Sequence, residues 1–335
     1  MSSERAARAV VFARTGEADV LRETEFPLFP PGPGEVLLRH TVVGVNFVDI
    51  YHRRGLYPLP LPSGLGLEAV GVIEEVGPGV GSLAPGQRVA YAQGPVGSYA
   101  TRRLVPAEAL VAVPPGVEDE TLAAVFLKGL TALALLRRTR PLAPDETALF
   151  HAAAGGVGHL AGQIARAIGV HLIGAARGPE KCAFALEQGY GACIDTSWED
   201  VPTSVRRLTG GQGVPVVYDS VGRATWTASL DCLRPFGMLV SFGNASGSVP
   251  PFDLGDLARR GSLYVTRPTL ATHWADPEGR RALVEELFAL LRAGALRPVI
   301  GGRYPLAEAA RAHRDLESRR TRGALLLLPG TESLP

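Results

Sequence analysis

A glycine-rich turn at residues 151–158 constrains the fold of this chain more than any other segment. It has the sequence HAAAGGVG and lies between an apolar stretch and a segment with helical periodicity. The spacing Ala153-x-Gly155-x-x-Gly158 matches the dinucleotide fingerprint, with alanine at the first glycine position. Gly155 lets the backbone approach a pyrophosphate, and Gly158 lets the helix pack closely on its strand. We therefore expect a strand, a tight turn and a helix whose N-terminus binds the pyrophosphate of a dinucleotide.

Strands and helices are expected to alternate after this turn. Apolar residues recur every three or four positions from Val157 to Ile168, and Gly169 ends that helix. Further strands are expected at 170–176, 192–195, 214–219, 238–242 and 262–266, with helices at 180–187, up to 209, and at 226–233. This βαβ rhythm predicts a doubly wound α/β domain, in which helices cover both faces of a parallel sheet.

The first 120 or so residues have a different, β-rich pattern. Segments such as EVLLRHTVVGVN (35–46) and AVGVIEEVGPGV (69–80) cluster β-branched residues between glycine and proline. A helix is expected at 120–136, another at 278–296, and a buried strand at 324–329. We expect a β-rich domain formed by residues 1–123 and 267–335, with a dinucleotide-binding domain inserted at 124–266.

Composition excludes several classes of protein. The chain has 335 residues, of which 46% are hydrophobic and 20% charged, so two domains with sizeable cores are expected. A formal net charge of +1 offers no electrostatic case for nucleic acid or a membrane surface as a partner. No segment has the length of a membrane span, and the start lacks a signal-peptide pattern. The three cysteines lack a CxxC pairing, which favours free thiols and a cytoplasmic location.

Basic residues follow the second strand of the expected sheet, where enzymes that use NADH usually have an acid. The strand ends Ala175-Ala176-Arg177-Gly178, and Lys181 follows shortly after. Two cations and no carboxylate favour the 2′-phosphate of NADPH over the ribose of NADH. The alternative is that both are surface residues at the start of a helix.

Two later segments end at the same edge of the sheet. VVYDSVG (216–222) contains Ser220, and SFGNASG (241–247) contains Phe242, Gly243 and Asn244. Ligands bind at the carboxyl edge of such sheets, so we expect both segments beside the nicotinamide and its ribose. The alternative is ordinary turn chemistry of glycine and asparagine.

Together with VGVNFVDIYHRRGLYP (43–58), LPSGLGLEAVGVIEEVG (61–77), FLKGLTA (126–132) and GSLYVTRP (261–268), these motifs resemble the zeta-crystallin-type quinone oxidoreductases. That family is the zinc-free branch of the medium-chain dehydrogenase/reductase superfamily. The resemblance runs from Ala9 to Pro329. It implies a GroES-like β-rich catalytic domain, a Rossmann domain with a doubly wound parallel sheet, and a cleft between them. It also implies a homodimer in which the strand at 262–266 pairs with its twin.

The resemblance also implies roles for individual residues. Asn46, Asp49 and Tyr51 would lie by the nicotinamide, as catalytic residues. Lys181 would bind the 2′-phosphate, whereas Thr196 stands where bacterial relatives often have a tyrosine, which Arg177 would offset. The other residues that it assigns to the cofactor are Lys128, Thr131, Gly155, Gly156, Val157, Gly158, Ser220, Phe242, Gly243, Asn244, Val265, Thr266, Arg267 and Arg320, with Arg319 close to the last.

The sequence argues against catalytic zinc, which needs three nitrogen, sulfur or carboxylate ligands around an open position. Asn46 stands where zinc-dependent relatives have a cysteine, Leu67 precedes Glu68 where they have histidine, and the four-cysteine lobe is absent. His52 is expected to be a solvent-facing loop residue. Without a Lewis acid, the chemistry suits an acceptor that is already electron-poor.

The leading hypothesis is therefore an NADPH-dependent quinone reductase, in which Tyr51 or Tyr57 donates a hydrogen bond or a proton to the acceptor. Either tyrosine could instead be a packed ring with its hydroxyl in water. An enone, enal or enoyl-thioester reductase of the same fold is the main alternative, and loops at 51–62 and 267–277 would decide between them. An RNA-binding or crystallin-like role is disfavoured by the near-neutral charge.

Overall fold

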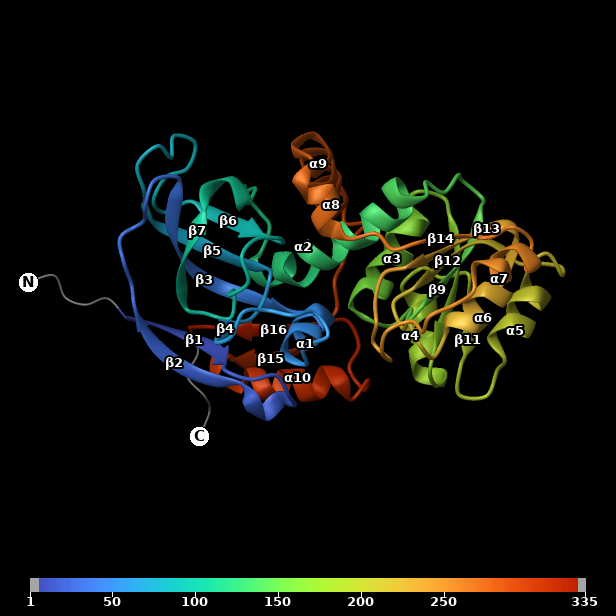
Figure 1. The fold of residues 1–335 in the computed structure, drawn as a ribbon. Helices are drawn as coiled ribbons and strands as arrows, with labels where there is room; N and C mark the ends of the chain where they lie inside the picture. Colours follow the sequence, from blue (N-terminus) through green and yellow to red (C-terminus); the bar gives the residue numbers. More distant parts are fainter. Residues whose placement is uncertain (1–5, 331–335) are drawn as a thin grey trace, which may run out of the picture. The chain divides into compact units, whose positions relative to one another are not determined.

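The protein, described here as a computed structural model over residues 6–330, divides into two compact units (Figure 1). Unit 1 contains the chain up to Leu127 and from Pro298 onward, and unit 2 contains Lys128–Arg297. Helix α2 (Asp119–Leu133) carries the chain from the first unit into the second. Unit 2 extends to Arg297, whereas the sequence pattern predicted a return to the first domain at residue 267.

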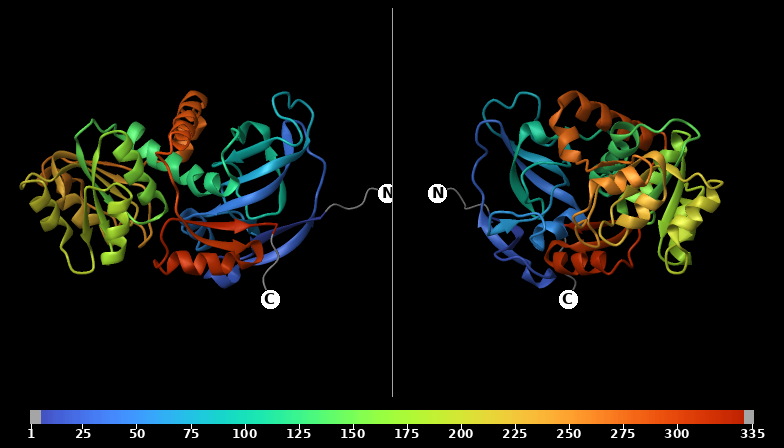
Figure 2. Two further views of the ribbon diagram at one scale, coloured as in Figure 1. Left: turned by 180° about the vertical axis from the view of Figure 1, so that it is seen from behind. Right: turned by 45° about the vertical axis from the view of Figure 1, so that its right-hand side comes forward.

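Unit 2 is built on a six-stranded parallel sheet with the order β11-β10-β9-β12-β13-β14. The order runs outward from β9 in both directions, and right-handed crossovers then place α3 and α4 on one face and α5, α6 and α7 on the other (Figures 1 and 2). This confirms the doubly wound sheet. The strands are β9 (Thr147–His151), β10 (His171–Ala176), β11 (Ala192–Asp195), β12 (Val214–Asp219), β13 (Leu233–Ser241) and β14 (Tyr264–Thr266). The helices are α3 (Gly156–Ala167), α4 (Pro179–Glu187), α5 (Val201–Leu208), α6 (Trp226–Asp231) and α7 (Leu254–Arg259).

Strand β13 begins at Leu233, five positions before the expected start at Met238. The earlier part contains Pro235 and Phe236, and Phe236 has a positive φ of 59°. Arg234 and Pro235 interrupt the apolar pattern of the strand, which is why periodicity located only its second half.

Residues 267–297 belong to unit 2 because of specific contacts. They form α8 (Leu270–Ala275) and α9 (Pro277–Arg292). Gln163 on α3 donates to the Arg297 carbonyl at 3.0 Å and accepts from the Arg297 N–H at 2.8 Å. Arg137 pairs with Glu286 on α9 at 3.2 Å. An amphipathic helix such as α9 can bury its apolar face against either domain. Its sequence pattern therefore did not reveal which unit it packs against.

Unit 1 contains two sheets, which confirm the β-rich architecture. A seven-stranded sheet has the order β15-β16-β3-β5-β6-β8, with β7 also paired to β3, and a three-stranded sheet has the order β2-β1-β4. The strands are β1 (Ala6–Phe12), β2 (Arg22–Pro27), β3 (Glu35–Val45), β4 (Ser63–Gly64), β5 (Ala69–Val76), β6 (Arg88–Tyr91), β7 (Arg102–Pro106), β8 (Val111–Ala112), β15 (Ile300–Pro305) and β16 (Ala324–Leu328). Besides α2, the helices are α1 (Phe47–Arg53) and α10 (Ala309–Glu317), and short 3₁₀ or π turns lie at Ala18–Val20, Ala107–Ala109, Ala134–Thr139 and Leu306–Glu308.

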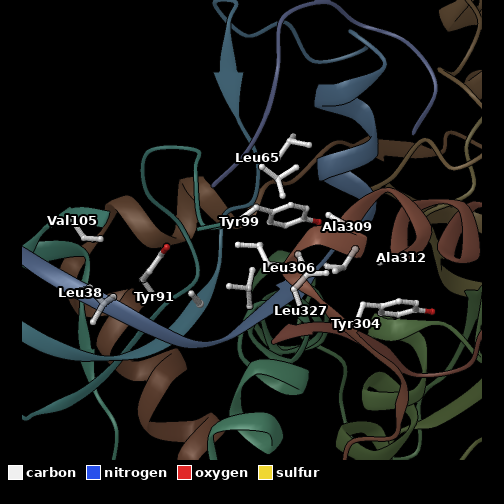
Figure 3. Packing of buried hydrophobic residues seen from close by; sticks show 14 of the residues in the cluster. Leu38, Leu65, Tyr91, Tyr99, Val105, Tyr304, Leu306, Ala309, Ala312 and Leu327 are labelled. Atoms are coloured by element: carbon white, nitrogen blue, oxygen red, sulfur yellow. The ribbon is translucent and has the colours of Figure 1, made fainter. Parts of the chain in front are cut away.

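The C-terminal segment completes the core of unit 1. Strand β16 pairs antiparallel with β3, in a register that places Leu326 opposite Gly44. Leu306 and Leu327 from the end of the chain join Leu38 and Leu65 from its beginning in one buried cluster, which Figure 3 shows. Among the described residues, no helix is long and apolar enough to cross a membrane.

Burial lowers the pKa of four histidines and holds them neutral: His40, His151, His159 and His313. Burial lowers the pKa of His40 and of His313 from 6.5 to about 3, and the pKa of His159 to about 4. His40 lies between the Ala100 carbonyl at 2.8 Å and the Tyr91 hydroxyl at 3.0 Å, which satisfy both ring nitrogens of the neutral form. The same histidines titrate near their ordinary pKa in the unfolded chain.

We therefore predict that stability falls as the pH drops. The unfolded chain binds protons that the folded chain rejects, so each histidine removes about 1.4 kcal/mol of unfolding free energy per pH unit below about pH 6. Denaturant unfolding between about pH 7 and about pH 5 measures this slope. His171→Gln is the control because that side chain is 62% exposed, and it should leave the slope unchanged. A stability that is flat over this range would contradict the prediction.

Candidate cofactor site and candidate active site

The glycine turn between β9 and α3 is sterically demanding. A Cβ on Gly158 would lie 2.3 Å from the Ala152 carbonyl oxygen and 2.7 Å from that of Ala153. Ala152 itself adopts a positive φ of 55°. A Cβ on Gly174 would lie only 2.8 Å from the methyl group of Ala153. Glycine on the neighbouring strand β10 therefore leaves room for alanine at the first fingerprint position. The predicted close packing of helix on strand is therefore present, with Gly155 as the N-cap of α3 and Gly156 and Val157 in its first turn.

Lys128 supplies a positive charge near this turn. Its side chain is buried on α2, three residues before Thr131 on the same helix. His159 packs against the turn, with Nδ1 2.9 Å from the Gly155 carbonyl oxygen. The low pKa of His159 comes mainly from burial, and the charge of Lys128 lowers it further.

The predicted 2′-phosphate residues converge where β10 and β11 end. Thr196 donates its N–H to the Ala176 carbonyl at 2.8 Å, which brings it beside Arg177. Arg177 and Thr196 are exposed, and Lys181 lies in the first turn of α4. Asp195 was not predicted from the sequence, and its Oδ1 accepts from the Gly178 N–H at 2.7 Å. Hydrogen bonds from Ser197 lower the pKa of Asp195, so this acid stays ionised and holds the loop.

A second group of predicted residues meets at the ends of β12, β13 and β14. Ser220 accepts from the Ala245 N–H at 3.2 Å, and a Cβ on Gly243 would lie 2.4 Å from the Ser220 carbonyl oxygen. Arg267 donates to the Gly243 carbonyl and to the Ser241 hydroxyl, both at 3.0 Å. Phe242 and Asn244 flank Gly243, and Val265 and Thr266 lie on β14 next to Arg267.

Asp219 organises the first of these loops and was also missed. This buried carboxylate accepts from the N–H groups of Val221 and Gly222 at 2.7 and 3.1 Å, and from the Thr225 hydroxyl at 2.6 Å. VVYDSVG was predicted to contribute its small polar residues. The structure shows that its aspartate fixes the backbone that presents them.

In unit 1, the NFVD motif forms the N-terminus of α1. Asn46 is the N-cap, and it forms a capping box with Asp49 in which each side chain accepts from the backbone N–H of the other. The Asn46 Nδ2 also donates to Glu68 Oε1 at 2.8 Å, and Glu68 Oε2 accepts from the Leu127 N–H at 2.9 Å. Asn46, Asp49 and Glu68 are all buried. A Cβ on Gly44 would lie 2.0 Å from Glu68, so glycine there makes room for the carboxylate.

A buried hydrogen-bonded chain lies behind Asp49. Tyr99 donates to Asp49 Oδ2 at 2.9 Å, and its oxygen lies 3.0 Å from His313 Nε2. The other ring nitrogen of His313 lies 3.2 Å from the Arg53 guanidinium, which Glu317 holds at 2.8 and 3.0 Å. An arginine only donates, so His313 Nδ1 accepts and Nε2 carries the proton. Tyr99 therefore receives from His313 and donates to Asp49, and burial raises its pKa well above 10.

No local signal in the sequence indicates this buried series of hydrogen bonds, because its members are up to 264 positions apart.

The predicted aromatic residues lie later in α1 and just after it. Tyr51 is buried, with its ring 5.2 Å from that of Tyr57 in an edge-on arrangement. His52 is a half-buried helical residue that contacts the Tyr57 carbonyl at 3.1 Å, so the expectation of a solvent-facing loop residue was wrong.

The structure also describes the predicted arginines near the C-terminus and the two predicted acceptor loops. Arg319 and Arg320 follow α10 and are exposed, and Arg319 has a positive φ of 58°. The Arg320 N–H donates to the Ser318 hydroxyl at 3.2 Å. The expected loop at 51–62 begins within α1, and the expected loop at 267–277 contains α8.

A doubly wound sheet with a glycine turn, joined to a β-rich unit that both ends of the chain build, defines an oxidoreductase of the medium-chain dehydrogenase/reductase superfamily. Two family descriptions match: "Alcohol dehydrogenase GroES-like domain" over residues 32–115 and "Zinc-binding dehydrogenase" over residues 156–287. Within the superfamily, the chain belongs to the quinone oxidoreductases.

Two quinone oxidoreductases and one further reductase are similar to this chain over nearly its whole length. The quinone oxidoreductase of Pseudomonas aeruginosa is 51% identical, over 96% of this chain and 100% of the relative. The crystal structure of Escherichia coli quinone oxidoreductase complexed with NADPH is 45% identical and superimposes with a TM-score of 0.95, over 96% of this chain and 100% of that one. The 2-haloacrylate reductase of a Burkholderia species is 43% identical, over 96% of this chain and 98% of the relative.

The residues of this chain do not fit the zinc ion that one family description names. Zinc takes thiolate, imidazole or carboxylate ligands, and an amide such as Asn46 is not among them. The Asn46 amide instead donates a hydrogen bond to Glu68. This bond engages the carboxylate that could have coordinated a metal. Across residues 6–330, no group of three or more histidine, cysteine, aspartate or glutamate side chains is arranged to hold a metal ion.

The turn geometry predicts the result of Gly158→Ala. The added methyl group would press on the Ala152 carbonyl, so α3 must move away from β9, at a cost of about 1–3 kcal/mol. Thermal unfolding should show the loss, and calorimetric titration should show weaker NADPH binding. Gly191→Ala is the matched control, because its Cβ would meet nothing closer than 4.0 Å. Equal stability and affinity of the two variants would refute the role of Gly158.

Proposed function

We propose that this protein reduces quinones with NADPH and without a metal ion. The observation that carries the proposal is the hydrogen bond between Asn46 Nδ2 and Glu68 Oε1, which is 2.8 Å long. The resemblance implies that Asn46 stands where zinc-dependent relatives have a cysteine. A site of this kind has no Lewis acid to polarise an alcohol or a simple ketone. A quinone needs no such activation, because it is already electron-poor. The relatives named quinone oxidoreductase support this acceptor.

The cofactor, when bound, supplies the reducing equivalents. The residues of unit 2 would bind and orient it: the N-terminus of α3 and Lys128 act on the pyrophosphate, and Arg177 and Lys181 act on the 2′-phosphate. Ser220, Phe242 to Asn244 and Val265 to Arg267 would hold the nicotinamide ribose. The NADPH complex of the Escherichia coli relative supports this choice of cofactor.

The residues of unit 1 would orient the acceptor. An amide has two donor hydrogens, of which Asn46 uses one for Glu68, and we assign the other to an oxygen of the quinone. Tyr51 or Tyr57 would donate the hydrogen bond or proton that the reduced oxygen needs. Asp49 is fully buried, and we assign it to positioning Asn46.

A second candidate is the reduction of an activated carbon–carbon double bond. The 43% identity to a 2-haloacrylate reductase favours it, since that relative has the same fold and nearly the same length. Enones, enals and enoyl thioesters are acceptors of this class.

Steady-state assays with a 1,4-naphthoquinone, an enone and 2-chloroacrylate would test the proposal. We expect NADPH-dependent turnover of the naphthoquinone, with a kcat/KM that is unchanged after dialysis against a chelator. Loss of activity on chelation, restored by zinc, would refute the metal-free mechanism. Turnover of the enone or the chloroacrylate alone would favour the second candidate.

Lys181→Ala tests the choice of cofactor. A lost charge-assisted hydrogen bond to the 2′-phosphate should raise the KM for NADPH about tenfold or more and leave the KM for NADH unchanged. Lys181→Arg keeps the charge and should retain most of the preference for NADPH. An equal change for both cofactors would mean that Lys181 does not contact the 2′-phosphate.

We also propose a cytoplasmic homodimer. β14 is an edge strand, and edges of this kind need covering. Phe236, Leu254 and Tyr264, in β14 or in segments that lead to it, are 70%, 73% and 56% exposed. Sedimentation should show a dimer that Tyr264→Arg dissociates. Trp198→Arg, on the loop after the opposite edge strand, should have no effect, and dissociation by neither variant would contradict the assignment.

A further inference from the structure

Two of the three cysteines, which the sequence predicted to be free thiols, lie in contact in unit 2. The Sγ atoms of Cys182 and Cys193 are 3.0 Å apart, and both side chains are partly exposed. Cys182 is on the first turn of α4, and Cys193 is on β11 opposite Gly174 of β10. A Cβ on Gly174 would lie 3.4 Å from the Cys193 sulfur, so glycine leaves space around it. The third thiol, Cys232, is fully buried elsewhere in the core.

The two thiols lie within the group of residues assigned to the 2′-phosphate. Cys182 directly follows Lys181, and Cys193 precedes Thr196 by three positions. Asp195, two positions after Cys193, accepts a hydrogen bond at 2.7 Å from the N–H of Gly178, which is the N-cap of α4. The start of α4 and the end of β11 are therefore joined both by a hydrogen bond and by the sulfur contact.

We propose that Cys182 and Cys193 form a vicinal dithiol site that oxidants convert to a disulfide, which weakens binding of the cofactor's 2′-phosphate. The consequence for binding rests on the proposed function, whereas the dithiol itself does not. Hydrogen peroxide is an oxidant of the required class. The Cys182 sulfur attacks the O–O bond and forms a sulfenic acid with release of water, and the Cys193 sulfur then displaces the hydroxyl as a second water. Two thiols lose two electrons and two protons, and the peroxide is reduced to two water molecules.

Closing the bond requires a small movement with a defined direction. A disulfide bond is about 2.05 Å long, so the sulfur atoms must approach by about 1 Å. β11 is held by its ladder of hydrogen bonds to β10, whereas the start of α4 lies outside that ladder and is joined to β11 by the hydrogen bond from the Gly178 N–H to Asp195. The turn that carries Lys181 should therefore move toward the sheet. Charge-assisted hydrogen bonds need close approach, so such a shift weakens the contact with a phosphate.

The surroundings of the thiols set the conditions of oxidation. Burial raises the pKa of both Cys182 and Cys193 above the ordinary value of 9, so both are protonated near neutral pH. The thiolate is the reactive form, and exchange with glutathione disulfide should be slow. Oxidation should accelerate as the pH rises, and the disulfide should be reversible by a dithiol reductant.

The test uses the full-length protein treated with diamide, which oxidises paired thiols and spares methionine. Peptide mapping without reduction should find one cross-linked peptide that joins Cys182 to Cys193. Cys182→Ser and Cys193→Ser should each abolish it, and Cys232→Ser should retain it. Oxidation of the wild type should raise the KM for NADPH about tenfold and leave that for NADH unchanged, and dithiothreitol should reverse the effect.

Each part of the proposal can fail on its own. If the diamide-treated wild type contains no Cys182–Cys193 peptide, the dithiol site is refuted. If the peptide forms and the ratio of the two KM values stays the same, the effect on the 2′-phosphate is refuted. The reduced wild type reports on the proposed function separately, since a lack of preference for NADPH there would refute the cofactor assignment while the peptide map still decides on the dithiol.

Discussion

The buried carboxylate of Glu68 is the interaction on which the candidate active site of unit 1 depends. A carboxylate in an apolar interior is costly unless hydrogen bonds satisfy it. Glu68 uses one oxygen for the Asn46 amide and the other for the Leu127 N–H, so it joins the segment entering α1 to helix α2. Gly44 leaves the space that it occupies. Removing either partner would leave a buried charge with a lost hydrogen bond, so the position of Asn46 and the position of α2 are coupled.

Carboxylates that accept hydrogen bonds from the backbone also occur where the strands of unit 2 end. Asp195 and Asp219 stand at the carboxyl ends of β11 and β12, and each accepts from backbone N–H groups of neighbouring loops. The carboxyl ends of parallel strands meet at one edge of a sheet, where ligands bind. Loops that are fixed by buried or half-buried carboxylates do not need to be ordered by the ligand, which lowers the cost of binding. Residues that never touch a cofactor can thereby determine how well it is held.

The sequence predicted the parts of this structure that are encoded locally. The turn at Gly155 and Gly158 was predictable because steric demands at a strand–helix junction leave glycine as the suitable residue there. The supporting carboxylates and the chain from Arg53 to Asp49 were not, since the partners of each side chain lie far along the sequence. The extent of unit 2 was missed for a related reason. The amphipathic pattern of α9 shows that one face is buried, and only the contacts of Gln163 with Arg297 show where.

The direction of the hydrogen bonds limits which residue can supply a proton to the acceptor. Arg53 donates to His313, His313 to Tyr99, and Tyr99 to Asp49, so every hydrogen along the chain points toward the carboxylate. Asp49 also accepts from the Asn46 N–H, so the hydrogen bonds from Asn46 and from Tyr99 both run toward its Oδ2. The Asn46 amide can donate a hydrogen bond but does not release a proton near neutral pH. Of the three residues that the resemblance would make catalytic, Tyr51 alone has a hydroxyl group, and the hydrogen-bonded series behind Asp49 supports the capping box that Asp49 forms with Asn46.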